Sequence, residues 1–506
     1  MTRSIRRRLL LTGMGCFAFA VGVTLVNVLL LPFERACHGI GGVQVLLPCA
    51  LAVLALGALG RCLRAADEAR LSRVRAVAVP AFLICLFAAQ LLLGYLMAYT
   101  PAGDNHAVYV GAQLLAGEGS LDNHPNYALY FARYENQWGF TLLLSAVWRL
   151  CALLGIAEAA PVLVLLQAAL YVPGMCAALS VMRRLRGVRG ELMLLASASL
   201  CLPLYLAAAV LYTDTFSLPF VLIALDWALR AQHAGSLRRQ LGCAAVCGLA
   251  ALIGAQIKMT VLIALIAAML CWLLSARPLR ALAMCALSAA IVLSGTSAVR
   301  SAALRVLVDP QVHVQQRMPV IHWVMMSVPR GDNPYGNAPT DYGITWKMMD
   351  EGASREEIMR SICTRLKDRV YTLRYPDRLI TAALRKNVAF AGDGTFGMTE
   401  MLDDDPVRPN AVSQLVLEGG AHFPAYKAVC TGIFAAQLLL ALWGCLRDIR
   451  RGDTRTALLC IAFFGVALFL MLWEARSRYL FSFVPVVLML CACRCAGLPG
   501  EEASAA

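Results

Sequence analysis

Long runs of apolar residues recur along almost the whole chain and are separated by short polar or basic stretches. About twelve of these runs are long enough to cross a hydrocarbon layer of ~30 Å as helices. They lie at residues 9–32, 42–63, 76–99, 160–182, 190–211, 214–230, 241–257, 259–276, 280–299, 424–446, 456–473 and 477–495. The pattern predicts an all-α polytopic membrane protein. No small-residue cleavage site follows the first run, so we expect it to remain as a helix.

Arginine clusters occupy alternate connections between the apolar runs. They fall within residues 3–8, 61–75, 183–189, 230–239, 277–280 and 447–455. Lys and Arg in short loops favour the cytoplasmic side of a membrane. With about twelve spans, every cluster and both chain termini are predicted to be cytoplasmic, while residues 100–138 and 300–423 are predicted to lie outside.

Residues 139–156 do not fit this alternation. They are apolar enough to enter a membrane, yet counting them as a span would put the arginines of 183–189 outside. We therefore expect a short re-entrant or juxtamembrane helix on the outer side.

Composition supports the membrane assignment and limits the partners. The chain is 60% hydrophobic and only 15% charged, below the share of charged residues in soluble domains. The net charge of +14 comes from arginines in short loops, so no nucleic-acid partner is expected. Most of the 19 cysteines lie in apolar runs and are expected to pack as small hydrophobes. Cys37 and Cys363 fall in outer segments, and a bridge between them is left open.

Ionisable residues in the predicted outer connections are the candidate chemistry. Asp104 follows an apolar run by a few residues, and an acid beside a membrane is costly to place. Lys258, Arg476 and Arg478 are cations on a side that otherwise has few. The plainer explanation is that each extends to the interface and pairs with an acid. Three such cations on one face favour a binding site.

The predicted outer segment 300–423 has the composition of a soluble domain. Ser354 and Glu357 have the spacing of a capping box and predict a helix over about residues 355–370. Residues 329–343 and 392–397 are rich in glycine and are predicted to be loops. Zinc-protease and serine-hydrolase motifs are missing from the sequence. Asp104 with a nearby histidine is a weak metal-ligand pattern, so no cofactor is expected and a divalent metal is not favoured.

Short motifs in these outer positions resemble the GT-C superfamily of membrane glycosyltransferases. An acid in the first outer loop corresponds to Asp104, and YTDTFSLPF (212–220) brings a second acid, Asp214. GLAALIGAQIKMTVLIAL (248–265) resembles a helix-turn-helix with a lysine, Lys258, at its turn. EARSRY (474–479) resembles a late arginine-bearing turn. The branch with the most similar layout is glycosyltransferase family 39, which includes the protein O-mannosyltransferases and aminoarabinose transferases.

Two features depart from that family. Asp104 is followed by Asn105 where eukaryotic mannosyltransferases have a second acid. Three apolar runs precede the acidic loop where the family usually has one, so residues 1–75 are expected to be an accessory transmembrane hairpin. The remaining parts would be a core over 76–299, an external segment over 300–423 and C-terminal helices over 424–506.

The resemblance implies a GT-C-like bundle that transfers a hexose or pentose from a polyprenyl-phosphate donor to a cell-envelope acceptor outside the cytoplasm. Such a reaction needs a carboxylate to deprotonate the acceptor and cations to bind the phosphate leaving group. Asp104 is the expected general base, and the three outer cations are the expected phosphate ligands. Positioning or acceptor binding is assigned to a further set of four residues: Asp214, His106, Tyr212 and Glu474.

Two other functions remain open at the level of sequence. A transporter or lipid flippase would place ionisable residues along a path through the membrane. A polymer ligase with a diphosphate-linked donor would also act outside, and it would use basic residues of the large external segment such as His313 and His322.

Overall fold

The computed structural model describes residues 2–30, 42–97, 101–329, 339–402 and 409–497. Every regular element within these ranges is a helix, and the one β-bridge joins Pro101 to Leu402. The all-α prediction is confirmed. Cys37 lies outside the described residues, so the proposed bridge to Cys363 stays untested.

Within the described ranges, eight helical segments are long and apolar enough to cross a membrane. Their bounds are α1 (Arg3–Leu30), α2 (Gly42–Ala65), α3 (Glu68–Met97), α7 (Ala160–Ser199), α11 (Leu237–Ile257), α13 (Pro278–Val306), α20 (Phe423–Arg451) and the segment Ser477–Ala496, which comprises α22 (Ser477–Leu480), η4 (Phe481–Phe483) and α23 (Val484–Ala496). A ninth candidate is a pair of segments bent by 117°, formed by α8 (Pro203–Leu206) with η2 (Ala207–Ala209) and by α9 (Thr213–Phe216) with α10 (Leu218–His233).

The count of about twelve spans is not confirmed, for two structural reasons. α7 contains the run 160–182 and the start of the run 190–211 as two helices that meet at Gly187, where the backbone is non-helical with φ of 64°, so the two runs are counted as one segment. Two other predicted runs form the shorter apolar helices α12 (Leu262–Ser275, after η3, Met259–Val261) and α21 (Ala457–Leu472).

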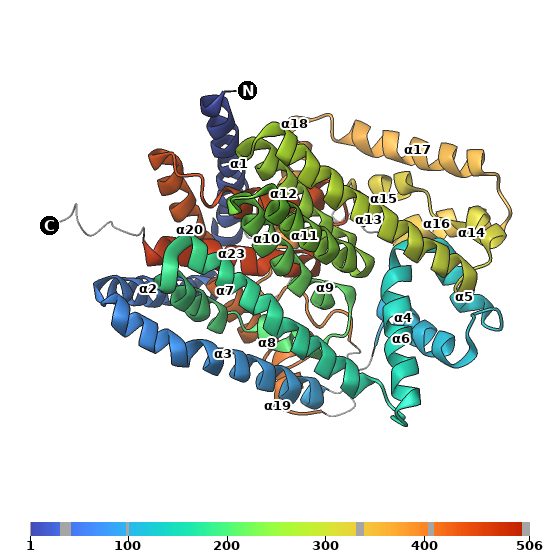
Figure 1. Ribbon diagram of the computed structural model, residues 1–506. Helices are drawn as coiled ribbons and strands as arrows, with labels where there is room; N and C mark the ends of the chain where they lie inside the picture. Colours follow the sequence, from blue (N-terminus) through green and yellow to red (C-terminus); the bar gives the residue numbers. More distant parts are fainter. Residues whose placement is uncertain (1, 31–41, 98–100, 330–338, 403–408, 498–506) are drawn as a thin grey trace.

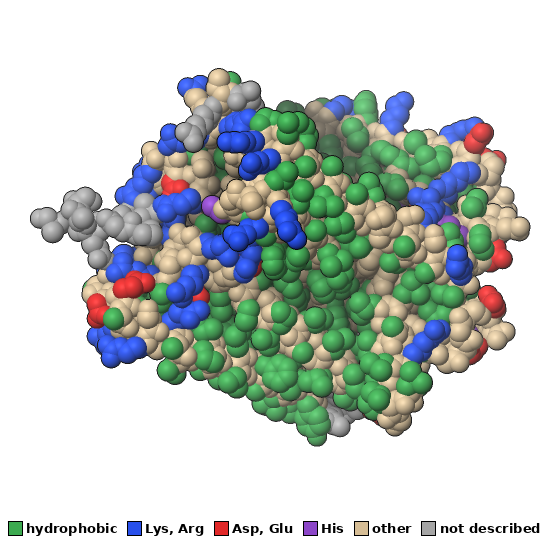
Figure 2. All heavy atoms as spheres, viewed as in Figure 1, with side chains coloured by type: hydrophobic (Ala, Val, Ile, Leu, Met, Phe, Trp, Pro, Cys, Tyr) green, Lys and Arg blue, Asp and Glu red, His purple; other side chains and the backbone are tan. Residues whose placement is uncertain are grey.

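The centre of the bundle is formed by four helices in succession: α10 packs against α7, α7 against α23, and α23 against α20. α2, α3 and α13 lie at the periphery and leave large apolar side chains exposed, including Leu54, Val77 and Leu282. Figure 2 shows that such side chains form a broad hydrophobic surface across the middle of the molecule. A surface of this kind suits contact with lipid.

Hydrogen bonds bring the arginine clusters together on one side of the bundle. Arg7 donates to the Gly452 carbonyl at 2.8 Å, and Arg186 contacts Asp448 at 3.0 Å. Arg75 pairs with Glu191 at 2.6 Å. The clusters that the sequence assigns to one membrane face therefore share one face of the fold, where Lys and Arg side chains gather in Figure 2.

The opposite side carries the first outer segment and the segment 300–423 (Figure 1). The first consists of α4 (Asp104–Glu118), α5 (Pro125–Arg133), η1 (Glu135–Gln137) and α6 (Trp138–Leu153). α6 matches the short helix predicted at 139–156 and packs against α4, α11 and α13.

The long segment folds into short helices, namely α14 (Pro310–Gln316), α15 (Val320–Ser327), α16 (Pro339–Asp350), α17 (Arg355–Thr372), α18 (Pro376–Ala391) and α19 (Ala411–Val416). The capping box of Ser354 and Glu357 is present at the start of α17, as predicted. Residues 339–343 were predicted as loop but begin α16, because Pro339 occupies a first-turn position that needs no N–H donor. The preceding 330–338 lie outside the described residues.

Candidate functional site

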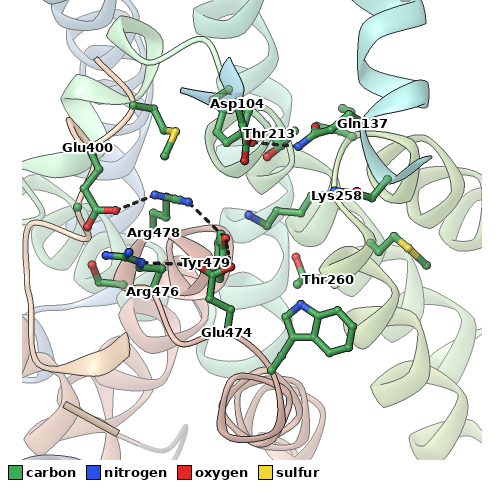
Figure 3. A pocket seen from close by; sticks show the side chains of 18 of the residues that line it. Asp104, Gln137, Thr213, Lys258, Thr260, Glu400, Glu474, Arg476, Arg478 and Tyr479 are labelled. Carbon is green, nitrogen blue, oxygen red and sulfur yellow. Dashed lines mark hydrogen bonds and ion pairs between the residues drawn. The ribbon is translucent and has the colours of Figure 1, made fainter. Parts of the chain in front are cut away.

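The predicted outer segments surround one cavity of about 1480 Å³. Its walls include Asp104, Tyr212, Lys258, Glu474 and Arg478. Figure 3 shows the side chains of Asp104, Lys258, Glu474 and Arg478 around a shared space. The expectation that Lys258 and Arg478 lie in one cavity is confirmed, although the two residues belong to different halves of the chain.

Asp104 begins α4 and faces this space. Gly103, the N-cap residue, has φ of 56°, a conformation that glycine adopts without strain and that turns the chain into the helix. The Asp104 carboxylate points toward Lys258 and Arg478 (Figure 3). Asp104 is exposed to the cavity, but the protein around it removes part of its hydration and raises its pKa, while the positive charge of Arg478 and the Tyr130 hydroxyl oppose that rise. A raised pKa makes this carboxylate a stronger base than a solvated aspartate.

Lys258 is the C-cap residue of α11 and extends into the cavity. Its ammonium pairs with Asp214 and lies 3.9 Å from the centre of the Tyr479 ring. An ammonium carries three N–H donors, so Lys258 can bind an anion without releasing Asp214.

Arg478 is held by two carboxylates and a hydroxyl. Its Nη1 donates to Glu400 Oε2 at 2.7 Å, and its Nε lies 3.7 Å from Asp214 Oδ2. Its Nη2 donates to the Tyr479 hydroxyl at 3.3 Å, and that hydroxyl donates to Glu474 at 2.9 Å. These contacts fix the guanidinium plane at the cavity wall.

Arg476 also lines the cavity, but it is placed differently from Arg478. Its Nε lies 3.5 Å from Glu474 Oε1, so it belongs to the same network through an acid. Glu474 thus joins Arg476 to Tyr479. The EARSRY motif contributes a connected set of groups to one wall.

Asp214 is buried behind the cations, and the structure corrects one detail of its placement. Because Asp214 stands at the start of the predicted run 214–230, the sequence predicts that it caps a helix; instead, Tyr212 is the N-cap of α9 and Asp214 lies within its first turn. Its carboxylate is oriented by Lys258 and Arg478. The difference arises because the chain bends by 117° between η2 and α9, so the helix already begins at Thr213, one residue before Asp214.

Tyr212 and His106 have different surroundings. The Tyr212 hydroxyl lines the cavity and accepts a hydrogen bond from Gln137 Nε2 at 3.0 Å. His106 follows Asp104 on α4, is exposed, and lies 3.5 Å from the Tyr127 hydroxyl. His106 is not among the cavity-lining residues.

Part of the cavity wall is apolar and continuous with the membrane-facing surface. Ile266 of α12 and Leu293 of α13 line the cavity and are 54% and 71% exposed. Phe469 of α21 is on the same wall. The cavity therefore opens sideways between helices, as a site for a membrane-embedded chain requires.

Sequence reasoning missed Glu400, Gln137 and Tyr479 as cavity residues. Tyr479 directly follows Arg478 in the motif already singled out. Glu400 follows the glycine-rich turn 392–397, in which Phe396 has φ of 56°. An acid close to a tight turn in an outer segment was the available signal, but nothing in the sequence linked it to Arg478.

Other residues considered for chemistry lie elsewhere. His313 and His322 are buried and do not line the cavity. Burial lowers the pKa of His322 to about 4, so its ring is neutral at physiological pH. Within the described ranges, no three His, Cys, Asp or Glu side chains are grouped as metal ligands.

Comparisons with known proteins give one family and two structures. A family model described as "Conserved hypothetical integral membrane protein" matches residues 42–496. The chain is similar to ArnT from Cupriavidus metallidurans in the apo state, with 16% identity and a TM-score of 0.34, over 84% of this chain and 78% of that one. The same protein bound to undecaprenyl phosphate is similar with 15% identity and a TM-score of 0.33, over 83% of this chain and 77% of that one. No curated protein sequence matches.

Proposed function

The chain belongs to the family of conserved hypothetical integral membrane proteins, and we propose that it transfers a sugar from a polyprenyl-phosphate-linked donor to an acceptor at the outer face of the cell membrane. The acceptor would be a glycan, lipid or protein of the cell envelope. The sugar would be a hexose or a pentose.

One observation carries this proposal. A carboxylate, Asp104, faces two cations, Lys258 and Arg478, across a cavity that is open to the membrane along α12 and α13. A lipid-linked sugar phosphate has three matching parts. Its prenyl chain fits the apolar wall, its phosphate fits the cations, and its sugar would lie between the phosphate and the base.

The chemistry follows from this arrangement as one displacement. Asp104 accepts the proton of an acceptor hydroxyl while the hydroxyl oxygen attacks the anomeric carbon of the donor. The bond between that carbon and the phosphate oxygen breaks, and its electron pair leaves with the polyprenyl phosphate. Lys258 and Arg478 stabilise the charge that develops on this leaving group. A single displacement inverts the configuration at the anomeric carbon.

Asp214 and Glu400 are proposed to be positioning residues. Both contact Arg478, and Asp214 also pairs with Lys258. They would keep the cations oriented before the donor binds, so that less side-chain conformational entropy is lost during binding. Charges of opposite sign around the buried cations also reduce the cost of holding them away from water.

Reconstituted full-length protein in lipid nanodiscs tests the proposal. The donors are polyprenyl-monophosphate sugars and the matching diphosphate sugars, incubated with cell-envelope extract from a strain that lacks the gene. Mass spectrometry should detect sugar transfer from the monophosphate donor, and transfer should persist in EDTA. Transfer from the diphosphate donor alone would indicate a polymer ligase. Movement of lipid across vesicles without any glycosylated product would indicate a flippase, and either result would overturn the proposal.

A further inference from the structure

Four aromatic side chains form a closed set of contacts on the cavity wall contributed by the outer segments. They are Tyr134, Trp323, Tyr342 and Trp346, and all four line the cavity. Ring centres are 5.9 Å apart for Tyr134 and Trp323, and 6.1 Å for Trp323 and Tyr342. They are 5.7 Å apart for Tyr342 and Trp346, and 6.4 Å for Trp346 and Tyr134. We call these four residues the aromatic platform.

Contacts behind the platform hold it in place. The Arg133 guanidinium lies 5.3 Å from the centre of a Trp346 ring, and Arg133 is itself fixed by Asp350 and by Gln316 Oε1 at 3.0 Å. On α16, buried Asp341 accepts two hydrogen bonds from Arg369 Nη2, at 2.6 and 2.7 Å. The rings are therefore ordered before any ligand binds, which favours a recognition surface.

The platform lies near the charged part of the cavity. Burial raises the pKa values of Tyr134 and Tyr342, and the negative charges of Asp104 and Glu474 raise them further. Gln137 lies one turn after Tyr134 and donates a hydrogen bond to the Tyr212 hydroxyl. The segment that carries Tyr134 therefore contacts Tyr212, which also lines the cavity. Lys258 and the four rings line the same cavity, so a ligand with its phosphate at Lys258 can extend toward the rings.

The chemistry of the rings favours a saccharide. Aromatic faces carry negative charge and attract the slightly positive C–H groups on one face of a pyranose or furanose ring. Pockets lined by aromatic rings with a few polar groups are typical of small-molecule sites. A prenyl chain would pack equally well against aliphatic side chains, and such side chains line the cavity on its apolar wall.

We propose that the aromatic platform binds the sugar ring of the donor, which rests on the function proposed above. The anomeric carbon is bonded directly to the phosphate oxygen. Its ring must therefore lie close to the cations and Asp104, in the cavity that the platform also lines. The assignment gives the external segment a role in recognising the donor.

Binding measurements on the full-length protein in nanodiscs test this assignment. The probes are polyprenyl phosphate without sugar and a panel of the same carrier linked to different hexoses and pentoses. The wild-type protein should bind at least one glycosylated carrier more tightly than the bare carrier. Trp346→Leu and Trp323→Leu should reduce that preference roughly 3- to 10-fold and leave affinity for the bare carrier unchanged. Trp346→Phe should restore part of the preference, because it keeps a ring.

Trp148→Leu is the matched control. Trp148 is also half-buried and packs on an aromatic ring, Tyr109, at 5.7 Å, but it does not line the cavity. Equal losses for both carriers, or an unchanged preference in the platform variants with native-like melting temperatures, would overturn the platform while leaving sugar transfer intact. Selective binding of glycosylated carriers without any transfer would instead contradict the proposed function.

Discussion

Lys258 and Arg478 share one carboxylate, that of Asp214, although they come from different halves of the chain. Neither cation belongs to the arginine clusters on the opposite side of the bundle. The pairing of both with a buried acid keeps two like charges in one wall of a cavity. An anion entering that cavity would find them already oriented.

Asp104→Asn should abolish most sugar transfer. The substitution keeps the size of the side chain and removes the base, so the rate should fall by roughly 10²–10⁴-fold. Affinity for polyprenyl phosphate should be retained, because the cations are untouched. Asp122→Asn is the control, since Asp122 is an exposed acid of the same outer segment that does not line the cavity. Near wild-type transfer by Asp104→Asn together with loss in Asp214→Asn would show that the wrong acid was assigned.

The pH dependence of transfer should reflect the raised pKa of Asp104. The base acts only when ionised, so kcat/KM should fall as pH decreases through a pKa above the ordinary aspartate range. Ionised Asp104 also disfavours the folded state, so its contribution to stability should decline as pH rises through the same range. The residual activity of Asp104→Asn should lack this acidic limb, and an identical limb in that variant would assign it to another group.

Lys258→Ala and Arg478→Ala should each weaken binding of bare polyprenyl phosphate. A charge-assisted contact contributes about 1.5–3 kcal/mol, and the loss also leaves Asp214 with one fewer counterion. Arg478→Lys should recover only part of the affinity, because an ammonium cannot reproduce a two-pronged contact. Arg374→Ala is the control, since Arg374 is exposed and contacts only nearby tyrosines among the described residues. Unchanged binding in both cavity variants would show that the phosphate binds at other residues.

Gly139→Ala should destabilise the protein and weaken donor binding. A Cβ at Gly139 of α6 would lie 2.5 Å from the Gln256 carbonyl oxygen, so the turn that presents Lys258 would have to move. Overpacking of this kind costs about 1–3 kcal/mol. The melting temperature should fall, whereas Gly117→Ala on α4 should be tolerated because nothing lies within 4 Å. Equal melting temperatures and equal donor binding for the two variants would contradict this account of the α6 contact.

Membrane orientation can be tested with two native cysteines. Cys363 of α17 and Cys62 of α2 are both exposed. An impermeant maleimide should label Cys363 in intact cells and Cys62 only after the cells are opened, as peptide mass spectrometry would show. The reverse pattern would place the cavity in the cytoplasm and contradict transfer at the outer face.

The sequence alone determined the all-α class and most of the long apolar helices, and it predicts which side each connection faces. Apolar run length and arginine placement act locally, because each segment meets the bilayer and its charge asymmetry on its own. The same reasoning grouped Asp104, Lys258 and Arg478 on one face before any contact was known. The capping box at Ser354 is similarly local, since its hydrogen bonds span three residues.

Tertiary structure decided what those residues contact. Glu400 reaches Arg478, and Trp346 reaches Tyr134, only because segments far apart in the chain pack together. Hydropathy and charge patterns carry no information about such long-range contacts, because these contacts depend on how the whole bundle packs. The tight junction at Gly187 is a further case, because the sequence separates the two apolar runs of α7 but does not specify the backbone conformation that joins them. The sequence therefore predicted that Asp104, Lys258 and Arg478 share one face of the molecule, whereas the architecture of the cavity came only from the tertiary structure.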